Sequence, residues 1–215
     1  MIERAQGIIL RTRSFTETSL IVEWLTPELG RISTVAKGAR RQKSPFRGKL
    51  DLFYEADFSF TRSRRSELHT LSEVGLKETH PTLRRDLGYL RQASYCATLI
   101  AQTTEKETPL PGIYELMRAF LSALPERPPQ PRSIYAFELK LLRELGLQPD
   151  LEETRLNPET KKLVEALTQS DWPQIAELKA SAAQAASLRQ FLHGFLIYHL
   201  GKIPKGRTDA IALQA

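Results

Sequence analysis

The chain has 215 residues, of which 41% are hydrophobic and 26% charged, values close to the average of globular proteins. This composition argues against a disordered chain and leaves room for one large domain or two small ones. Lysine and arginine outnumber the acidic residues by 31 to 25, and the resulting net charge of +6 favours polyanionic partners without fixing the fold.

The first 80 residues have the pattern of short strands separated by turns. Pro27 and Gly30 mark the clearest turn, because proline presets one backbone angle and glycine permits a positive φ. The apolar residues between 52 and 60 alternate as in a half-buried strand. Strands are predicted over residues 7–13, 19–26, 31–36, 52–60 and 68–76. In the fifth strand, one face carries Leu68, Thr70, Val74 and Leu76.

These strands indicate a small antiparallel β-barrel. They lie close together, and no helical pattern between them is long enough to cross over between parallel strands. An OB-type barrel and an SH3-like barrel both suit the number of strands, and periodicity alone does not separate them.

After His80 and Pro81 the apolar residues recur with the period of helices. Helices are predicted over residues 83–100, 114–124, 134–145, 157–167 and 188–196. Gly146 is the expected C-terminal cap of the third helix, and Asn157 followed by Pro158 has the form of a helix start. The predicted fold class is therefore α+β with two domains, a β-barrel over residues 1–80 and an all-helical bundle over residues 81–215.

One segment, residues 31–50, carries the functional signal. It holds seven basic residues and no acidic one, so the rest of the chain has 31 − 7 = 24 basic and 25 acidic residues. Its basic residues are Arg31, Lys37, Arg40, Arg41, Lys43, Arg47 and Lys49. A loop so one-sided in charge predicts contact with a phosphate backbone, because binding releases the counterions condensed on it.

Two further residues are candidates for the same surface. Phe46 lies inside the basic segment and could stack on a base or, alternatively, anchor the loop to the barrel. Arg11 extends the basic surface if it points outward, and an ordinary solvated strand face is the alternative. Arg62, Arg64 and Arg65 could form a second basic turn, although a plain charged hairpin tip is favoured.

Motifs for catalysis or metal binding are absent from the sequence. It contains no phosphate-binding glycine loop, no HExxH and no GxSxG, so we expect no enzyme. The single cysteine, Cys96, excludes an internal disulfide and reads as a buried residue of a helix. No signal peptide or membrane-spanning run of about 18 apolar residues is present, and we expect a cytoplasmic protein that contacts no membrane.

Several segments resemble the RecO family, and they follow one another in the order of that family. Residues 137–151 resemble its central helix, which ends in a glycine and a proline, and residues 188–202 resemble its last helix. The N-terminal matches are Gly7-Ile8-Ile9-Leu10, Glu17, the turn Thr26–Gly30 and the most characteristic segment, Ala36-Lys37-Gly38-Ala39-Arg40-Arg41.

The resemblance implies an OB-fold barrel followed by a helical domain. It implies binding to single- and double-stranded DNA, annealing of complementary strands, and loading of RecA together with RecR and single-strand-binding protein, whose C-terminal tail binds the helical domain of family members. Lys37, Arg40 and Arg41 then become the leading candidates for DNA contact. Many relatives carry four cysteines after a Pro-Asp-Leu segment; here Pro149-Asp150-Leu151 is followed by none, so no zinc or other cofactor is expected.

Three other functions remain open on the residues alone. The first is an RNA-binding barrel of translation or RNA processing, because OB barrels serve both nucleic acids. The second is an interaction scaffold in which the basic segment only aids solubility. The third is an enzyme with an unrecognised site.

Overall fold

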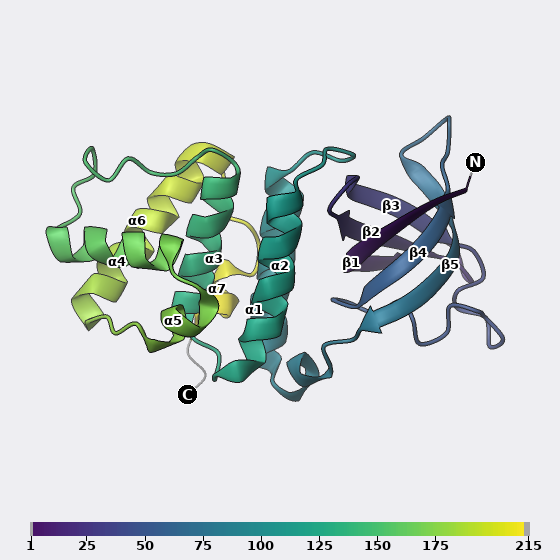
Figure 1. Cartoon of the computed structure of the whole chain (residues 1–215), viewed down its shortest axis with the longest axis horizontal. Coiled ribbons are helices and arrows are strands. Elements are labelled where there is room, and N and C mark those ends of the chain that lie inside the picture. The colour runs from purple at the N-terminus through teal and green to yellow at the C-terminus, as the bar shows by residue number, and fades with distance from the viewer. Residues whose placement is uncertain (1, 213–215) are drawn as a thin grey trace. The chain divides into compact units, whose positions relative to one another are not determined.

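A computed structural model describes residues 2–212, and its N-terminal part is a closed five-stranded barrel (Figure 1). The strands are β1 (Ile2–Ser14), β2 (Leu20–Thr26), β3 (Gly30–Ala36), β4 (Glu55–Thr61) and β5 (Leu68–Glu78). Their order around the barrel is β1-β2-β3-β5-β4, and every pair is antiparallel except β3 with β5. This arrangement decides between the two barrels that the sequence left open, in favour of the OB type.

The barrel interior is filled by the alternate residues of each strand. Trp24 stacks on Phe58 with ring centroids 4.0 Å apart, and its indole nitrogen donates a 2.9 Å hydrogen bond to the Thr34 hydroxyl. That bond satisfies the one polar group of a fully buried tryptophan. The period of two predicted from the sequence therefore reflects a packed core on the inner face of each strand.

Two details of the strand prediction are wrong. β4 begins only at Glu55, and Glu55 itself is buried, where its carboxylate lies 2.9 Å from the His80 ring. In β5 the buried residues are His69, Leu71 and Val74, of which only Val74 belongs to the predicted face, and Leu76 is 38% exposed. The cause is a bulge: Ser59 pairs with Glu73 but Phe60 pairs with Leu71, so one extra residue reverses the facing of the strand.

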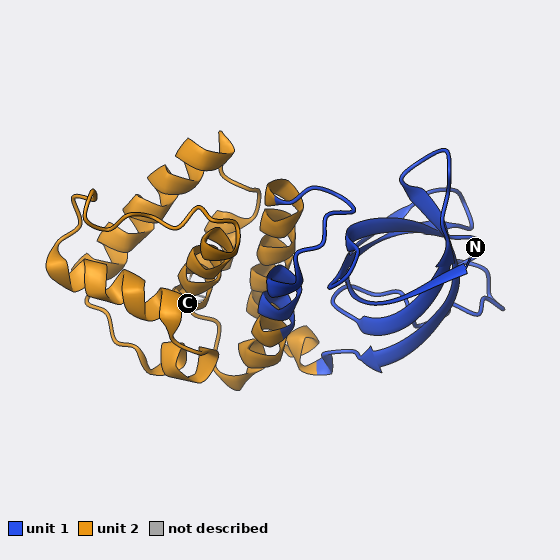
Figure 2. Cartoon of the chain, turned by 45° about the horizontal axis from the view of Figure 1, so that its top comes forward, with its two compact units in different colours: residues 1–81, 104–118 blue, residues 82–103, 119–215 orange. Residues whose placement is uncertain are grey.

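Contacts divide the chain into two compact units (Figure 2). The barrel unit comprises the chain up to residue 81 together with residues 104–118, and the helical unit comprises residues 82–103 and 119–215. The barrel thus takes in a segment that follows the first long helix. Within the barrel unit, Gln6 of β1 donates a 2.8 Å hydrogen bond to the Tyr114 hydroxyl of that segment.

The rest of the described chain, up to residue 212, is helices joined by loops. The helices are two short 3₁₀ helices, η1 (Pro81–Arg85) and η2 (Leu124–Glu126), and the α-helices α1 (Leu87–Thr103), α2 (Pro111–Ala123), α3 (Pro131–Glu144), α4 (Pro158–Gln169), α5 (Trp172–Glu177), α6 (Ala182–Leu200) and α7 (Arg207–Ile211). The predicted caps are confirmed: Asn157 accepts a 2.8 Å hydrogen bond from the Thr160 amide, and Gly146 has φ +71° after α3. In the predicted apolar stripe of α6, Leu188, Leu192 and Leu196 are buried, and Phe191 and Phe195 are half-buried.

The core of the helical unit joins α3, α4, α5 and α6. Its buried residues include Leu139 of α3, Leu163 of α4, Ile175 of α5 and Leu192 of α6. Two elements of this unit, α5 and α7, were not predicted. Each spans only a turn or two, too short to show an apolar period.

Candidate nucleic-acid interface

The connection between β3 and β4 is an ordered loop of successive turns. We call residues 37–49 the basic loop. Backbone amides donate to carbonyls three residues earlier at Arg41, Ser44, Arg47 and Lys49, with lengths of 3.0–3.2 Å. Because the backbone bonds largely to itself, the loop has a defined conformation, from which some side chains project into solvent and others pack on the barrel.

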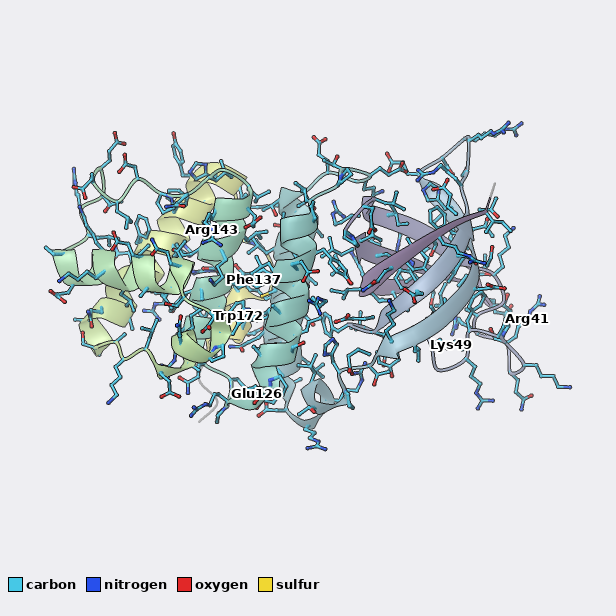
Figure 3. The ribbon with its side chains drawn as sticks, in the orientation of Figure 1. Arg41, Lys49, Glu126, Phe137, Arg143 and Trp172 are labelled. Carbon is cyan, nitrogen blue, oxygen red and sulfur yellow. The ribbon has the colours of Figure 1, made fainter. Side chains whose placement is uncertain are left out.

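Five cations of the basic loop are exposed to solvent. Figure 3 shows one of them, Arg41, extending away from the barrel. The five exposed cations are Lys37, Arg40, Arg41, Lys43 and Arg47. Phosphate oxygens suit such a group, since arginine offers a planar fork of donors and lysine a mobile point charge.

Phe46 holds the basic loop on the barrel. It is only 7% exposed and belongs to the same core cluster as Trp24 and Phe60. Of the two alternatives for this residue, anchoring fits its position and base stacking does not, because neither face of the ring is open to a ligand. We therefore correct the sequence-based inclusion of Phe46 among the contact residues.

Arg31 and Lys49 also differ from the five exposed cations. The Arg31 guanidinium donates hydrogen bonds of 2.7 and 2.6 Å to the hydroxyl and carbonyl oxygens of Thr104, and burial lowers its pKa. Lys49 is half-buried, and its ammonium donates a 3.1 Å hydrogen bond to the Val74 carbonyl. Both side chains hold parts of the barrel unit together, which narrows the candidate contact set to the exposed cations.

The remaining arginine candidates have different surroundings. Arg11 is exposed on β1, opposite Glu23 of β2 in the strand register, so it sits beside an acidic neighbour. Arg62 donates 2.7 Å hydrogen bonds to both Glu3 and Glu107. These hydrogen bonds raise the pKa of Arg62 and lower that of Glu3. Arg62 is thus paired within the barrel unit, while Arg64 and Arg65 of the same turn are exposed.

The hairpin between β1 and β2 supports the start of the basic loop. The Arg40 amide donates a 2.9 Å hydrogen bond to the Thr18 carbonyl, and the Gly38 amide donates a 3.4 Å hydrogen bond to the Ser19 hydroxyl. Gly38 leaves β3 with φ +68°, a left-handed conformation that favours glycine. Sequence alone did not predict that this hairpin borders the loop, although the aromatic Phe15 among its turn residues was a usable signal.

The described residues contain no cluster of metal ligands and no exposed thiol. Among residues 2–212, no group of three or more histidine, cysteine, aspartate or glutamate side chains could hold a metal ion. Cys96 is fully buried in α1, and burial raises the pKa of its thiol. Of the helices described, none has the length and apolar character that crossing a membrane requires.

The fold and this surface define an α+β protein of the OB-fold class with a cationic loop beside its barrel. Two family models match the chain. Residues 1–80 match the model described as Recombination protein O N terminal, and residues 84–155 match Recombination protein O C terminal. The chain belongs to the RecO family.

Curated relatives agree with the family models. A DNA repair protein RecO from Anaeromyxobacter sp. (strain K) is 35% identical over 146 residues, which are 68% of this chain and 58% of the relative. That of Listeria monocytogenes serotype 4b (strain CLIP80459) is 32% identical over 158 residues, covering 74% and 61%. That of Alkaliphilus metalliredigens (strain QYMF) is 26% identical over 237 residues, covering 94% and 96%. The chain thus spans about three fifths of the first two relatives and nearly all of the third.

Proposed function

We propose that the chain is a DNA-binding recombination mediator of DNA repair that binds single- and double-stranded DNA through the basic loop. The observation that carries this proposal is the group of five exposed cations without an acidic residue between positions 31 and 50. Each phosphate that they neutralise releases condensed counterions, which makes binding favourable and dependent on salt. Phosphate contacts position a protein without reading bases, so binding has low sequence specificity.

The finer parts of the proposal rest on family membership. The protein anneals complementary strands, and with RecR and single-strand-binding protein it loads RecA, in the bacterial cytoplasm and without catalysing a covalent step. The names of the relatives, which are DNA repair proteins, support the repair role. Annealing of complementary oligonucleotides coated with single-strand-binding protein tests it; failure to anneal at low salt contradicts the mediator role.

The contact residues are tested by fluorescence anisotropy of a labelled single-stranded oligonucleotide at several salt concentrations. For the triple variant Lys37→Ala, Arg40→Ala, Arg41→Ala we expect weaker binding and a slope of log K against log salt shallower by about two units, since each single-strand contact contributes roughly 0.7. The matched control removes the same charges from exposed positions of the helical unit, as Arg91→Ala, Arg155→Ala, Lys205→Ala. Equal slopes for wild type and the loop variant would place the DNA site elsewhere.

The same titration, repeated with a structured RNA of equal charge, separates two competing functions. A clear preference for structured RNA over DNA of equal charge favours an RNA-binding barrel, since phosphate contacts alone do not distinguish the two. Absence of binding to either nucleic acid at physiological salt favours a protein-interaction scaffold.

A further inference from the structure

Phe15 is an exposed aromatic residue at the tip of the β1–β2 hairpin. Its side chain is 53% exposed, unlike the fully buried Phe53 and Phe60 of the same unit. The tip is nevertheless held closed, because the Phe15 amide donates a 3.0 Å hydrogen bond to the Ser19 carbonyl and the Ser19 amide donates 3.1 Å to the Thr16 hydroxyl. An apolar ring is therefore presented to solvent from a backbone that is already ordered, so binding through it orders little further backbone.

The hairpin tip that carries Phe15 lies next to the basic loop. The Arg40 guanidinium donates a 3.5 Å hydrogen bond to the hydroxyl of Ser14, the residue before Phe15. The Arg40 amide donates a 2.9 Å hydrogen bond to the Thr18 carbonyl. The exposed cations Lys37 and Arg41 flank Arg40 in the loop. Aromatic side chains beside a cationic track are the combination that binds single-stranded nucleic acids, in which phosphates meet the charges and bases stack on the rings.

The hairpin tip carries one acidic residue, which affects where the phosphates of a bound strand can lie. Glu17 is exposed in the turn that follows Phe15. Its negative charge disfavours a phosphate at the tip itself, while the loop beside it attracts one. The backbone of a bound strand is thereby drawn to the loop, and the tip is left to an uncharged base.

We propose that Phe15 is a base-stacking residue that gives the DNA site a preference for unpaired strands. This inference rests on the proposed function, because the cations of the basic loop must hold the flanking phosphates. In a duplex the faces of the bases are covered by their neighbours in the stack, so the ring finds a partner only on a single strand. Phe15 thus takes the stacking role that the burial of Phe46 excludes.

The test compares three probes of equal length: a single-stranded oligonucleotide, the same strand with a central run of abasic sites, and its duplex. The abasic strand keeps the phosphates and removes the bases. For Phe15→Ala we expect affinity for the normal single strand to fall about 5- to 150-fold, which corresponds to the roughly 1–3 kcal/mol of one stacked base. Affinity for the abasic strand and the duplex changes less than about twofold, and the salt slope is unchanged because no charge is removed.

Two further variants make the result specific. Phe15→Trp keeps a stacking ring, so it retains the affinity for single strands, and its added fluorescence is quenched when a base stacks on it. Tyr198→Ala removes another exposed aromatic, 84% exposed on α6, and serves as the matched control with no expected effect.

The outcomes separate this inference from the function it rests on. If Phe15→Ala binds all three probes like wild type while the loop variant is weakened, the stacking role is wrong and the DNA site stands. If Phe15→Ala weakens all three probes equally, the residue supports the loop structure and does not stack. If wild type binds none of the probes, the proposed function itself fails. Preserved DNA binding with loss of a protein partner in Phe15→Ala would assign the ring to a protein interface and overturn the inference.

Discussion

The backbone of Thr108 runs directly against Gly30: a β-carbon built on Gly30 would lie 2.0 Å from the Thr108 carbonyl oxygen. Next to this contact, the Glu107 amide donates a 2.9 Å hydrogen bond to the Arg31 carbonyl. Residues that follow the first long helix are in this way fastened to the β2–β3 turn. The contact explains why segment 104–118 belongs to the barrel unit.

Replacing Gly30 is therefore expected to be costly. Gly30 has φ +64°, so Gly30→Ala meets both a left-handed backbone, which costs about 1–2 kcal/mol, and the overlap with Thr108. We expect a loss of more than about 2 kcal/mol in the free energy of unfolding by urea. Gly48→Ala is the control, because Gly48 has φ +73° with nothing within 4 Å of the added carbon. Equal losses for both variants would show that the Thr108 contact adjusts freely.

The helical unit contains a buried ion pair whose removal is a second test. Arg207 of α7 donates hydrogen bonds of 2.7 and 2.9 Å to the Glu138 carboxylate of α3, and the two residues are 3% and 0% exposed. Tyr95 donates a further 2.5 Å hydrogen bond to the same carboxylate. Breaking such a pair leaves a buried charge without its partner, so Arg207→Ala should cost about 3–5 kcal/mol.

The expected recovery in a double variant identifies charge as the cause. Arg207→Met with Glu138→Gln leaves no charge in the site and keeps an oxygen acceptor for Tyr95, and it should unfold at a higher urea concentration than Arg207→Ala. Loss of far-UV circular dichroism follows the helices, and Lys205→Ala, an exposed neighbour, is the control without effect. If the double variant is no more stable than Arg207→Ala, lost packing rather than the uncompensated charge sets the cost.

The sequence predicted those parts of the structure that leave a signal within a short stretch of residues. Alternation and helical period located the five strands and the long helices, and Asn157 and Gly146 identified helix ends, because such signals lie within a few neighbouring residues. The bulge in β5 was invisible, since one inserted residue changes the facing without changing composition. The short helix α7 escaped for the same lack of a local signal, and with it the burial of Arg207.

The sequence also indicated the candidate site only in part. Charge count located the basic loop, but a count gives every cation the same weight. The structure separates Arg31 and Lys49, whose donors are engaged by Thr104 and Val74, from the exposed cations. These partners lie 73 and 25 residues away in the chain, a distance over which no sequence pattern reports pairing.

The stability of the barrel should depend on the protonation of His69. The ring is 1% exposed, and its Nδ1 accepts a 3.3 Å hydrogen bond from the Ser63 amide. Burial lowers the pKa of His69 below its ordinary value of about 6.5, against the weaker opposing pull of Glu107. Because the folded pKa lies below the unfolded one, this contribution to stability is complete above about pH 6.5 and is lost as the pH falls through the lowered value.

Urea denaturation of wild type between pH 7.5 and 5.5 measures this dependence. We expect stability to decline in the part of that range below about pH 6.5, and we expect His69→Phe, which keeps a flat ring against Phe60, to decline less. His193→Phe is the control, since His193 is exposed on α6. A parallel decline in wild type and His69→Phe would assign the pH dependence to another group.

Substitution of Phe46 distinguishes an anchor from a ligand contact. Phe46→Ala removes a ring packed into the barrel core and should cost about 3–5 kcal/mol in the free energy of unfolding, while Phe46→Leu, which keeps much of the apolar volume, should cost less. Because the charges of the basic loop are untouched, folded Phe46→Leu should bind single-stranded DNA with the wild-type salt slope. It should also keep the wild-type ratio of affinities for a normal and an abasic strand, since a buried ring stacks on no base. A normal stability with a reduced ratio would place Phe46 on the DNA after all.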